Sequence, residues 1–109
     1  MSRGNVYSAL RRSTFNPRPS PLVLYMIIEN FRDGDPRPVY ARFRERGRLA
    51  PEGLRYVSSW VTDDHARCYQ VMDTDDPALL DQWMAQWRDL VEFEVVPVIT
   101  SAQAAEVIR

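Results

Sequence analysis

The apolar run Leu22–Ile28 is the feature that most constrains the fold of this chain. Apolar side chains occupy both alternating positions of the run, and most of its residues favour β-structure. This pattern is typical of a strand that is buried on both faces. We therefore expect the run to lie inside a sheet that is covered on each side.

Two Asp-Pro pairs mark the starts of two predicted helices. Asp35 and Pro36 form a typical N-cap and first helical residue, and this helix is predicted to end at Gly47. Asp76 and Pro77 repeat the signal before a second helix. A broad apolar stripe makes this second helix the main core helix, and its members are Leu79, Leu80, Trp83, Met84 and Trp87.

Three further strands are predicted, over residues 54–61, 67–72 and 91–99. Thr100, followed three residues later by Gln103, forms a capping box that predicts a short C-terminal helix. The resulting order is β-α-β-β-α-β with one added helix. It indicates a ferredoxin-like α+β domain with an antiparallel sheet and both main helices on one face.

In this topology the strands over residues 22–28 and 67–72 are central, and one sheet face carries no helix. The first strand has apolar side chains on that face too. A second copy, packed sheet against sheet around a two-fold axis, would cover it. We therefore expect a homodimer of the dimeric α/β-barrel type.

The 109 residues suffice for one domain, which we place at residues 22–109. Residues 1–21 have no apolar period and contain Pro17, Pro19 and Pro21, so we expect a disordered or loosely attached arm. The arm's arginine- and serine-rich composition also resembles an organelle transit peptide. We expect a cytoplasmic protein with no membrane partner, because no run approaches the roughly 20 apolar residues of a membrane span and no secretory signal is evident.

Composition excludes several chemistries. All 14 basic residues are arginine, so Schiff-base catalysis and lysine general bases are impossible. The lone cysteine, Cys68, cannot form an internal disulfide, and with the single histidine, His65, it cannot supply a structural zinc site. We expect no metal and no cofactor.

A candidate pocket arises if the hairpin closes symmetrically around the turn Asp63–Ala66. Trp60 would then face Cys68, and Ser58 would face Gln70, on one side of the sheet. A few polar groups among large apolar ones are typical of a site for a small apolar or aromatic ligand. The alternative is an ordinary core in which these groups bond to backbone.

Glu29 ends an apolar strand near Tyr25, and it is our candidate for a general base. The alternative is a carboxylate paired with Arg32 or another arginine. Cys68 has no evident activator and is expected to behave as a small hydrophobe. His65, between acids in a turn, is expected to be solvated, with a metal-ligand role alongside Asp63 or Asp64 as the alternative.

Arginines concentrate on the first helix and its exit loop, a pattern that also occurs in nucleic-acid binders. Residues 1–21 hold four arginines and no acid, so the remaining chain is net acidic. The third strand also lacks the glycine-aromatic pattern by which ferredoxin-like RNA binders stack bases. We expect a solvated helix face and no nucleic-acid partner; the residues concerned are Arg37, Arg42, Arg44, Arg46 and Arg48.

Several segments together resemble a family of small bacterial proteins described as a domain of unknown function. The resemblance covers about residues 24–107 and rests on Leu24–Glu29, Arg46–Leu54, Arg67–Met72, Asp75-Asp76-Pro77 and Glu92–Val98. This family is similar in architecture to the dimeric α/β-barrel proteins, which include cofactor-free monooxygenases, lactone isomerases, polyketide cyclases and haem-binding members. The resemblance implies the fold and assigns no catalytic residue.

Two functional hypotheses follow. The first is a small-molecule-binding dimer with a pocket between sheet and helices, which by resemblance would be a cofactor-free isomerase, cyclase or monooxygenase. The second is a non-enzymatic dimeric binding or accessory protein whose polar core groups are structural. A ligand-sized cavity containing Trp60, Gln70 or Glu29 would favour the first hypothesis, and a filled core the second.

Overall fold

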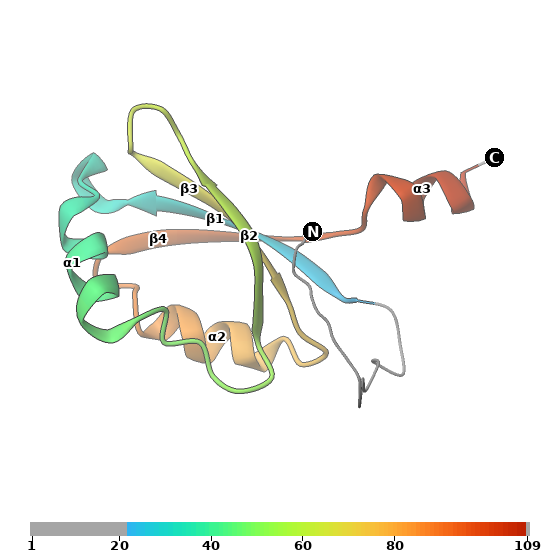
Figure 1. The fold of residues 1–109 in the computed structure, drawn as a ribbon, viewed down its shortest axis with the longest axis horizontal. Helices are drawn as coiled ribbons and strands as arrows, with labels where there is room; N and C mark the ends of the chain where they lie inside the picture. The colour runs from blue at the N-terminus through green and yellow to red at the C-terminus, as the bar shows by residue number, and fades with distance from the viewer. Residues whose placement is uncertain (1–21, 109) are drawn as a thin grey trace, which may run out of the picture.

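The computed structural model describes residues 22–108, and the arm predicted over residues 1–21 lies outside this range. The described chain is an α+β fold of ferredoxin-like order (Figure 1). Its elements are β1 (Leu24–Phe31), the 3-10 turn η1 (Arg32–Gly34), α1 (Arg37–Arg46), β2 (Arg55–Val61), β3 (Arg67–Asp73), α2 (Ala78–Ala85), β4 (Val91–Val98) and α3 (Ser101–Val107).

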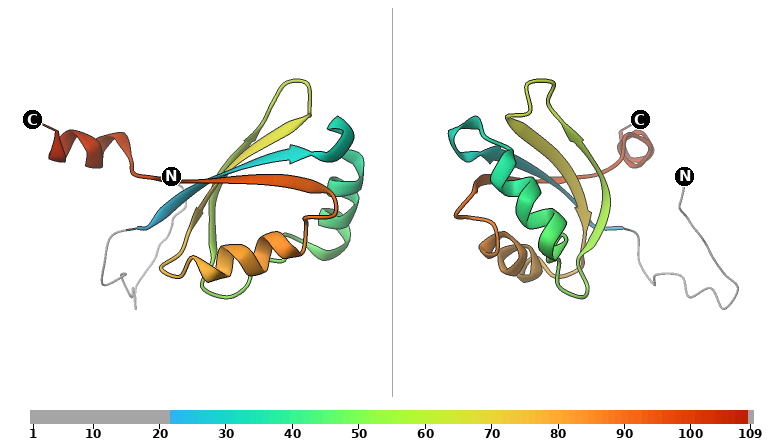
Figure 2. Two further views of the ribbon diagram at one scale, coloured as in Figure 1. Left: turned by 180° about the vertical axis from the view of Figure 1, so that it is seen from behind. Right: turned by 60° about the vertical axis from the view of Figure 1, so that its left-hand side comes forward.

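The four strands form one antiparallel sheet in the order β2-β3-β1-β4, so β1 and β3 are central as predicted. The sheet brings together residues far apart in the sequence. One row across it joins Ser59, Gln70, Ile27 and Val95. The helices α1 and α2 both lie on one side of the sheet (Figure 1 and Figure 2), and Gln70 and Ile27 of this row are buried.

The first strand is displaced from its predicted bounds. It begins at Leu24 instead of Leu22 and continues to Phe31, because β4 offers partners from Val98 to Val91 along that length. The backbone N–H of Val23 donates to the Asp73 side chain instead of entering the ladder. The hydrophobic run therefore located the strand, but the pairing partners decided where it starts and ends.

Both main helices begin one residue later than predicted. Pro36 is the cap of α1, not its first residue, and Asp35 accepts a hydrogen bond from the backbone N–H of Arg37 from one position further out. Pro77 caps α2 in the same way, with Asp76 accepting from Ala78 N–H. The Asp-Pro signal thus marked the correct turns with a shift of one position.

The core fills the space between the sheet and the two helices. Ile27 and Met72 from the central strands, Val91 from β4 and Trp83 from α2 are at most 2% exposed. Leu80, Met84 and Trp87 are also buried, so most of the predicted stripe faces the core. Leu79 is only partly buried against this core.

The β2–β3 hairpin contains a register shift that the symmetric prediction lacked. Tyr56 pairs with Met72, but a bulge between Tyr56 and Ser58 leaves Val57 without a partner in β3. Beyond the bulge, Ser59 pairs with Gln70 and Val61 with Cys68. The predicted pairs Ser58–Gln70 and Trp60–Cys68 are therefore wrong, because one extra residue reverses which side chains face the helices.

The opposite face of the sheet carries its own apolar side chains. One row joins Trp60, Tyr69, Ile28 and Glu94, and a neighbouring row contains Met26 and Val96. These residues are half-buried or exposed, and Trp60 is 58% exposed. This face is not covered by α1 or α2 (Figure 2).

The C-terminal helix α3 starts with the predicted capping box: Thr100 accepts from Gln103 N–H, and the Gln103 side chain accepts from Thr100 N–H. The helix projects beyond the sheet and buries none of its residues (Figure 1). Within residues 22–108, none of the helices combines the length and the apolar character needed to cross a membrane.

Candidate functional site

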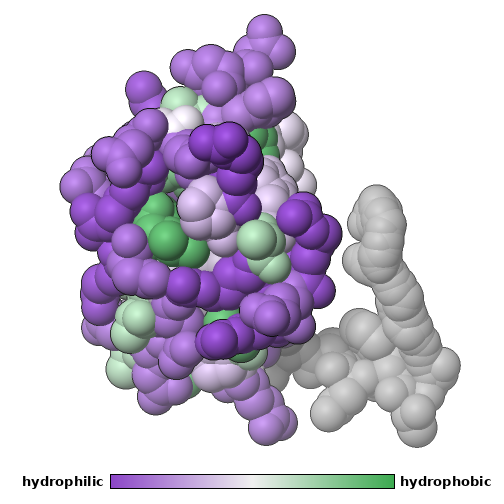
Figure 3. Space-filling model, turned by 90° about the vertical axis from the view of Figure 1, so that its left-hand side faces the viewer, coloured by the Kyte–Doolittle hydropathy of each residue, from purple (hydrophilic) through white to green (hydrophobic). Residues whose placement is uncertain are grey.

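A pocket of about 160 Å³ lies between the sheet and α1. The sheet contributes Glu29, the loop after α1 contributes Arg48, and the remaining walls are mostly apolar or aromatic. These walls are formed by Phe31, Val39, Tyr40, Phe43, Ser59, Val61, Cys68, Gln70, Trp83 and Trp87. The molecular face that carries α1 is largely hydrophilic, with small hydrophobic patches between the polar side chains (Figure 3).

Glu29 is the buried acid of this pocket, with 7% of its surface exposed. It belongs to the row that also contains Cys68, Val61 and Phe93, so its neighbours in the sheet offer it little solvation. Burial raises the pKa of Glu29 from 4.5 to about 7, although a hydrogen bond from Gln70 and the charge of Arg48 each act to lower it. At neutral pH the carboxyl group can therefore both donate and accept a proton.

Gln70 links this acid to Arg48. Its amide Nε2 donates to Glu29 Oε2, and its Oε1 accepts from Arg48 Nε at 2.7 Å. Both ends of the amide are thereby engaged, which fixes its orientation. Two hydrogen bonds thus join the Arg48 guanidinium, the Gln70 amide and the Glu29 carboxyl group in that order, and we call this arrangement the relay.

Aromatic rings hold the Arg48 guanidinium in place. Its Cζ lies 3.8 Å from the centre of the Tyr56 ring and 5.2 Å from that of Phe43. Both distances suit cation–π contact. Tyr56 also shares a hydrogen bond with Ser59, which ties this ring to the pocket wall.

Hydrogen bonds also fix the backbone of Arg48. The indole N–H groups of Trp83 and Trp87 both donate to the Arg48 carbonyl oxygen, each at 3.0 Å. The next residue, Leu49, has a φ of 65°, in the left-handed region that non-glycine residues seldom adopt. The core helix and the turn after it thus impose the loop conformation that points Arg48 at Gln70.

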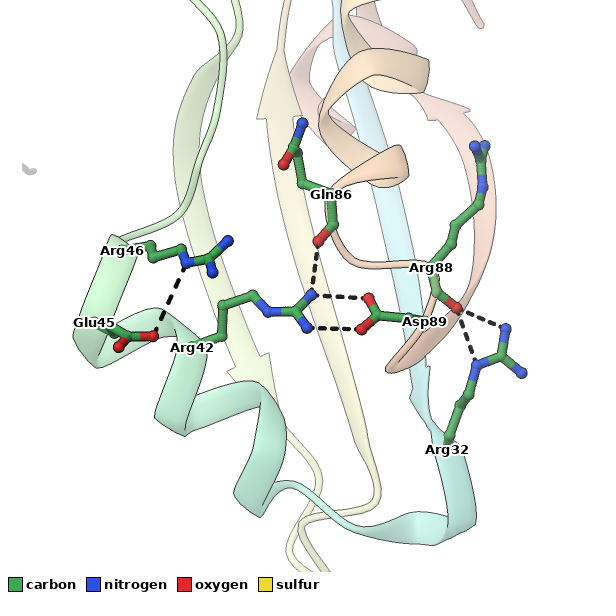
Figure 4. A network of polar contacts seen from close by, with 7 residues as sticks. All are labelled: Arg32, Arg42, Glu45, Arg46, Gln86, Arg88 and Asp89. Atoms are coloured by element: carbon green, nitrogen blue, oxygen red, sulfur yellow. Dashed lines mark hydrogen bonds and ion pairs between the residues drawn. The ribbon is translucent and has the colours of Figure 1, made fainter.

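An arginine network joins α1 and the turn before it to the connection between α2 and β4 (Figure 4). Arg42 makes a two-pronged contact with Asp89 at 2.8 and 2.7 Å and donates to the carbonyl of Gln86. Arg32 donates twice to the carbonyl of Arg88 in the same connection (Figure 4). Both arginines therefore secure the connection between α2 and β4, one from α1 and one from the turn that precedes it.

Cys68 lines the pocket but is unsuited to nucleophilic chemistry. Burial, together with the charge of Glu29, raises the pKa of its thiol to about 12. A thiol with this pKa is protonated at neutral pH. Cys68 therefore contributes surface to the pocket, in line with the behaviour expected from its sequence.

Three of the six residues predicted for the site line the pocket: Glu29, Cys68 and Gln70. Ser58 and Trp60 do not, because the bulge turns them to the opposite face, and Ser59 and Val61 take their places. Tyr25 faces the helices but pairs with Met72 near the other end of β1, where it packs against the core.

Sequence reasoning missed the contributions of α1 and its exit loop. Tyr40, Phe43 and Arg48 line the pocket, whereas Arg48 was grouped with the solvated arginines. Gly47, which ends α1 beside Arg48, indicates in the sequence that the chain turns there. A local signal of this kind does not show which residues the following loop contacts. Trp83 and Trp87 were assigned to the core, and they serve both the core and the pocket wall.

Within residues 22–108, no three His, Cys, Asp or Glu side chains gather in a way that would hold a metal ion, and this includes the turn around His65. Asp64 instead stabilises that turn by accepting from Thr62 and from the backbone N–H of Ala66.

Comparison with known proteins gives one family. A family described as "Domain of unknown function (DUF3303)" matches residues 23–109, in agreement with the resemblance and close to the extent found from the sequence. No curated protein and no solved structure matches the chain.

Proposed function

The chain belongs to the family described as Domain of unknown function (DUF3303), and we propose that it binds a small molecule and transfers a proton within the pocket. The observation that carries this proposal is the position of Glu29, a buried carboxyl group at the wall of a partly apolar pocket and fixed by Gln70. Its pKa of about 7 supports a role as general base and acid.

Proton transfer to Glu29 suffices for two of the reaction classes implied by the resemblance to dimeric α/β-barrel proteins. In an isomerisation, the carboxylate takes a proton from a carbon next to a carbonyl group and returns it to another atom of the resulting enolate. In an aldol-type cyclisation, the enolate carbon adds to a second carbonyl carbon of the same molecule, and Glu29 returns its proton to the oxygen of that carbonyl group. Monooxygenation would further require dioxygen as a co-reactant. We therefore favour an isomerase or cyclase without a cofactor.

Ketonisation of the enol of a small aryl-substituted 2-oxo acid, phenylpyruvate, tests this proposal. The wild-type protein is expected to accelerate the loss of enol absorbance, with a kcat/KM that rises as pH increases through about 7, where Glu29 of the unliganded protein ionises. Glu29→Gln is expected to lower the acceleration about 100-fold or more, because general acid–base catalysis commonly contributes that much.

Glu45→Gln is the matched control, because Glu45 is exposed on α1 with 76% of its side chain accessible. It should leave the rate unchanged. Equal rates for wild type and Glu29→Gln would contradict the proposal. Saturable binding without any acceleration would favour the alternative function, a non-enzymatic binding or accessory protein.

We also propose that the functional unit is a homodimer. Two features support it: the apolar rows on the sheet face away from α1 and α2, and the projecting helix α3. Trp60 and Val96 are exposed on that face, and Val107 and Ile108 near the end of the chain are 79% and 77% exposed. A second copy of the chain would remove both sets from water.

Light scattering at micromolar concentration is expected to report twice the chain mass. Trp60→Glu would place a carboxylate in the interface and is expected to give monomers, whereas Arg46→Glu adds negative charge on α1 in the other layer and should leave the dimer intact. A wild-type protein that scatters as a monomer would refute the dimer.

A further inference from the structure

Arg48 has binding capacity that the fold does not use. Its Nε donates to Gln70 and its plane rests against Tyr56 and Phe43. Among the contacts of the described residues, Nη1 and Nη2 of Arg48 have no hydrogen-bond partner. The Nε hydrogen bond and the two neighbouring aromatic rings fix this guanidinium, and its outer N–H groups stay available. It is well arranged to bind a planar anion through two parallel hydrogen bonds.

The charges around the pocket favour an anion as well. Arg48 is the cation among the lining residues, and Glu29 is the acid that faces it through Gln70. Two other titratable groups face Glu29, Tyr40 from α1 and Cys68 from β3. Both are neutral near pH 7, and burial raises their pKa values further. The pocket is therefore net positive whenever Glu29 is protonated.

We propose that Arg48 is the anion-binding residue of this pocket and that the ligand is a small aromatic monocarboxylate. The inference rests on the proposed function and names its substrate class: the carboxylate lies on the Nη groups of Arg48, and the ring packs among Phe43, Trp83 and the neighbouring apolar walls. The relay through Gln70 then places Glu29 one amide away from the anion.

The volume of the pocket limits the size of this ligand. A dry cavity of about 150 Å³ can hold benzene, and the pocket here measures about 160 Å³. One six-membered ring fills such a space. The anionic substituent reaches Arg48 on the side of the loop that follows α1.

Binding of an anion must be coupled to the protonation of Glu29. A second negative charge near the carboxyl group favours its protonated form, so ligand binding raises the pKa of Glu29 and takes up a proton. Affinity is therefore higher at pH 6 than at pH 8. The hydroxyl and amide side chains that also line the pocket are those of Ser59 and Gln70, and neither group titrates.

Titration with benzoate and benzamide, followed by NMR of the backbone amides of the full chain, tests the inference. The two probes have nearly the same shape and differ in charge. Benzoate is expected to shift the resonances of pocket residues and to bind at least tenfold more tightly than benzamide at pH 6. Its dissociation constant should rise severalfold at pH 8, and this rise should disappear in Glu29→Gln.

Arg48→Met keeps an unbranched stem between the aromatic rings and removes the charge. It is expected to weaken benzoate at least tenfold and to leave benzamide unchanged. Arg46→Met is the matched control, because Arg46 is exposed on the last turn of α1 and makes only a 3.9 Å contact with Glu45. It should alter neither affinity.

Equal affinity of the two probes for wild type would overturn the assignment of an anionic ligand and leave the proton-transfer pocket in place. The same conclusion follows if Arg48→Met retains the preference for benzoate. No shift of pocket resonances by either probe would overturn both this inference and the proposed ligand-binding function. If Arg48→Met loses the dispersed spectrum of a folded protein, the wild-type comparison and its pH dependence decide the matter.

Discussion

The carboxyl group of Glu29 lies on a strand whose other inward-facing side chains include Ile27 and Phe31, so burial opposes its ionisation. In the folded chain its pKa is about 7, against 4.5 when unfolded. Between these values the unfolded chain releases a proton that the folded chain keeps, so the free energy of unfolding falls as pH rises. Above about pH 7 both states are ionised and the loss is complete.

This linkage predicts that wild-type stability drops by about 3 kcal/mol between pH 4.5 and pH 8 from Glu29 alone. Glu29→Gln should remove this part of the slope and make the protein more stable than wild type at pH 8. Urea denaturation at several pH values measures it. Glu45→Gln, on the exposed face of α1, should keep the wild-type slope, and an unchanged slope in Glu29→Gln would show that burial does not raise this pKa.

Gln70 uses both ends of its amide inside the protein, where it bonds to Glu29 and to Arg48. Gln70→Ala is expected to cost about 1–3 kcal/mol, because it leaves the buried carboxyl group of Glu29 and the half-buried Nε of Arg48 without this partner. It should also raise the pKa of Glu29 above 7, since the hydrogen bond from Gln70 lowers it.

Carbon-detected NMR titration of the Glu29 carboxyl group reports this second effect directly. Ser59→Ala is the control in the same pocket, because Ser59 bonds to Tyr56 and not to Glu29. It should leave the pKa of Glu29 in place. A Gln70→Ala variant with wild-type stability and an unchanged pKa would mean that the relay does not form.

At the scale of elements, α2 and the turn after it join the core to the site. Trp83 is 2% exposed in the centre of the core, and its indole N–H donates to the Arg48 carbonyl. Trp87 donates to the same oxygen from the turn that follows α2. The helix and the turn after it thus supply apolar burial and, through one indole each, fix the conformation of the loop that carries Arg48.

Trp83→Ala is expected to cost about 3–5 kcal/mol through lost burial and the remaining cavity. Trp83→Phe keeps much of the apolar volume but removes one donor to the Arg48 carbonyl, so it should cost less and weaken benzoate binding more than benzamide binding. Arg46→Ala, on the exposed last turn of α1 and outside the core, should change stability by no more than about 0.5 kcal/mol. Thermal melts measure the loss of stability in each variant. A small loss in Trp83→Ala would show that the core does not centre on Trp83.

For the whole molecule, the two layers formed by the sheet and by α1 with α2 are complete without α3, which buries none of its residues. Removal of residues 101–109 should therefore change the unfolding free energy of the monomer by no more than about 1 kcal/mol. The pocket resonances should keep their positions.

If α3 packs against a second copy, the same truncation should also raise the dissociation constant of the dimer, which sedimentation equilibrium measures. Replacing Glu106, on the same helix, by Gln keeps the helix and serves as the control. A truncated chain that loses its cooperative unfolding transition would show that α3 is part of the monomer core.

The sequence by itself determined the order of the elements, the centre of the sheet and the faces of the core helix. Hydrophobic periodicity, Asp-Pro helix starts and the Thr100–Gln103 capping box are local signals, and each depends on residues close together in the chain. These signals placed the starts of β1, α2 and α3 within two residues of where the structure has them, whereas β1 extends three residues beyond its predicted end. They also selected Glu29, Cys68 and Gln70, because polar groups on apolar strands stand out in a sequence.

Only the tertiary structure decided which side chains meet. The bulge at Val57 turns Ser58 and Trp60 away from the helices, and Ser59 and Val61 face the helices in their place. The reason is that one extra residue in a strand moves every later side chain to the other face. Arg48 became a site residue because two indoles from α2 and the turn after it fix its carbonyl, 35 and 39 positions away in the chain. Contacts over such distances depend on how the layers pack, and no local pattern of residues encodes them.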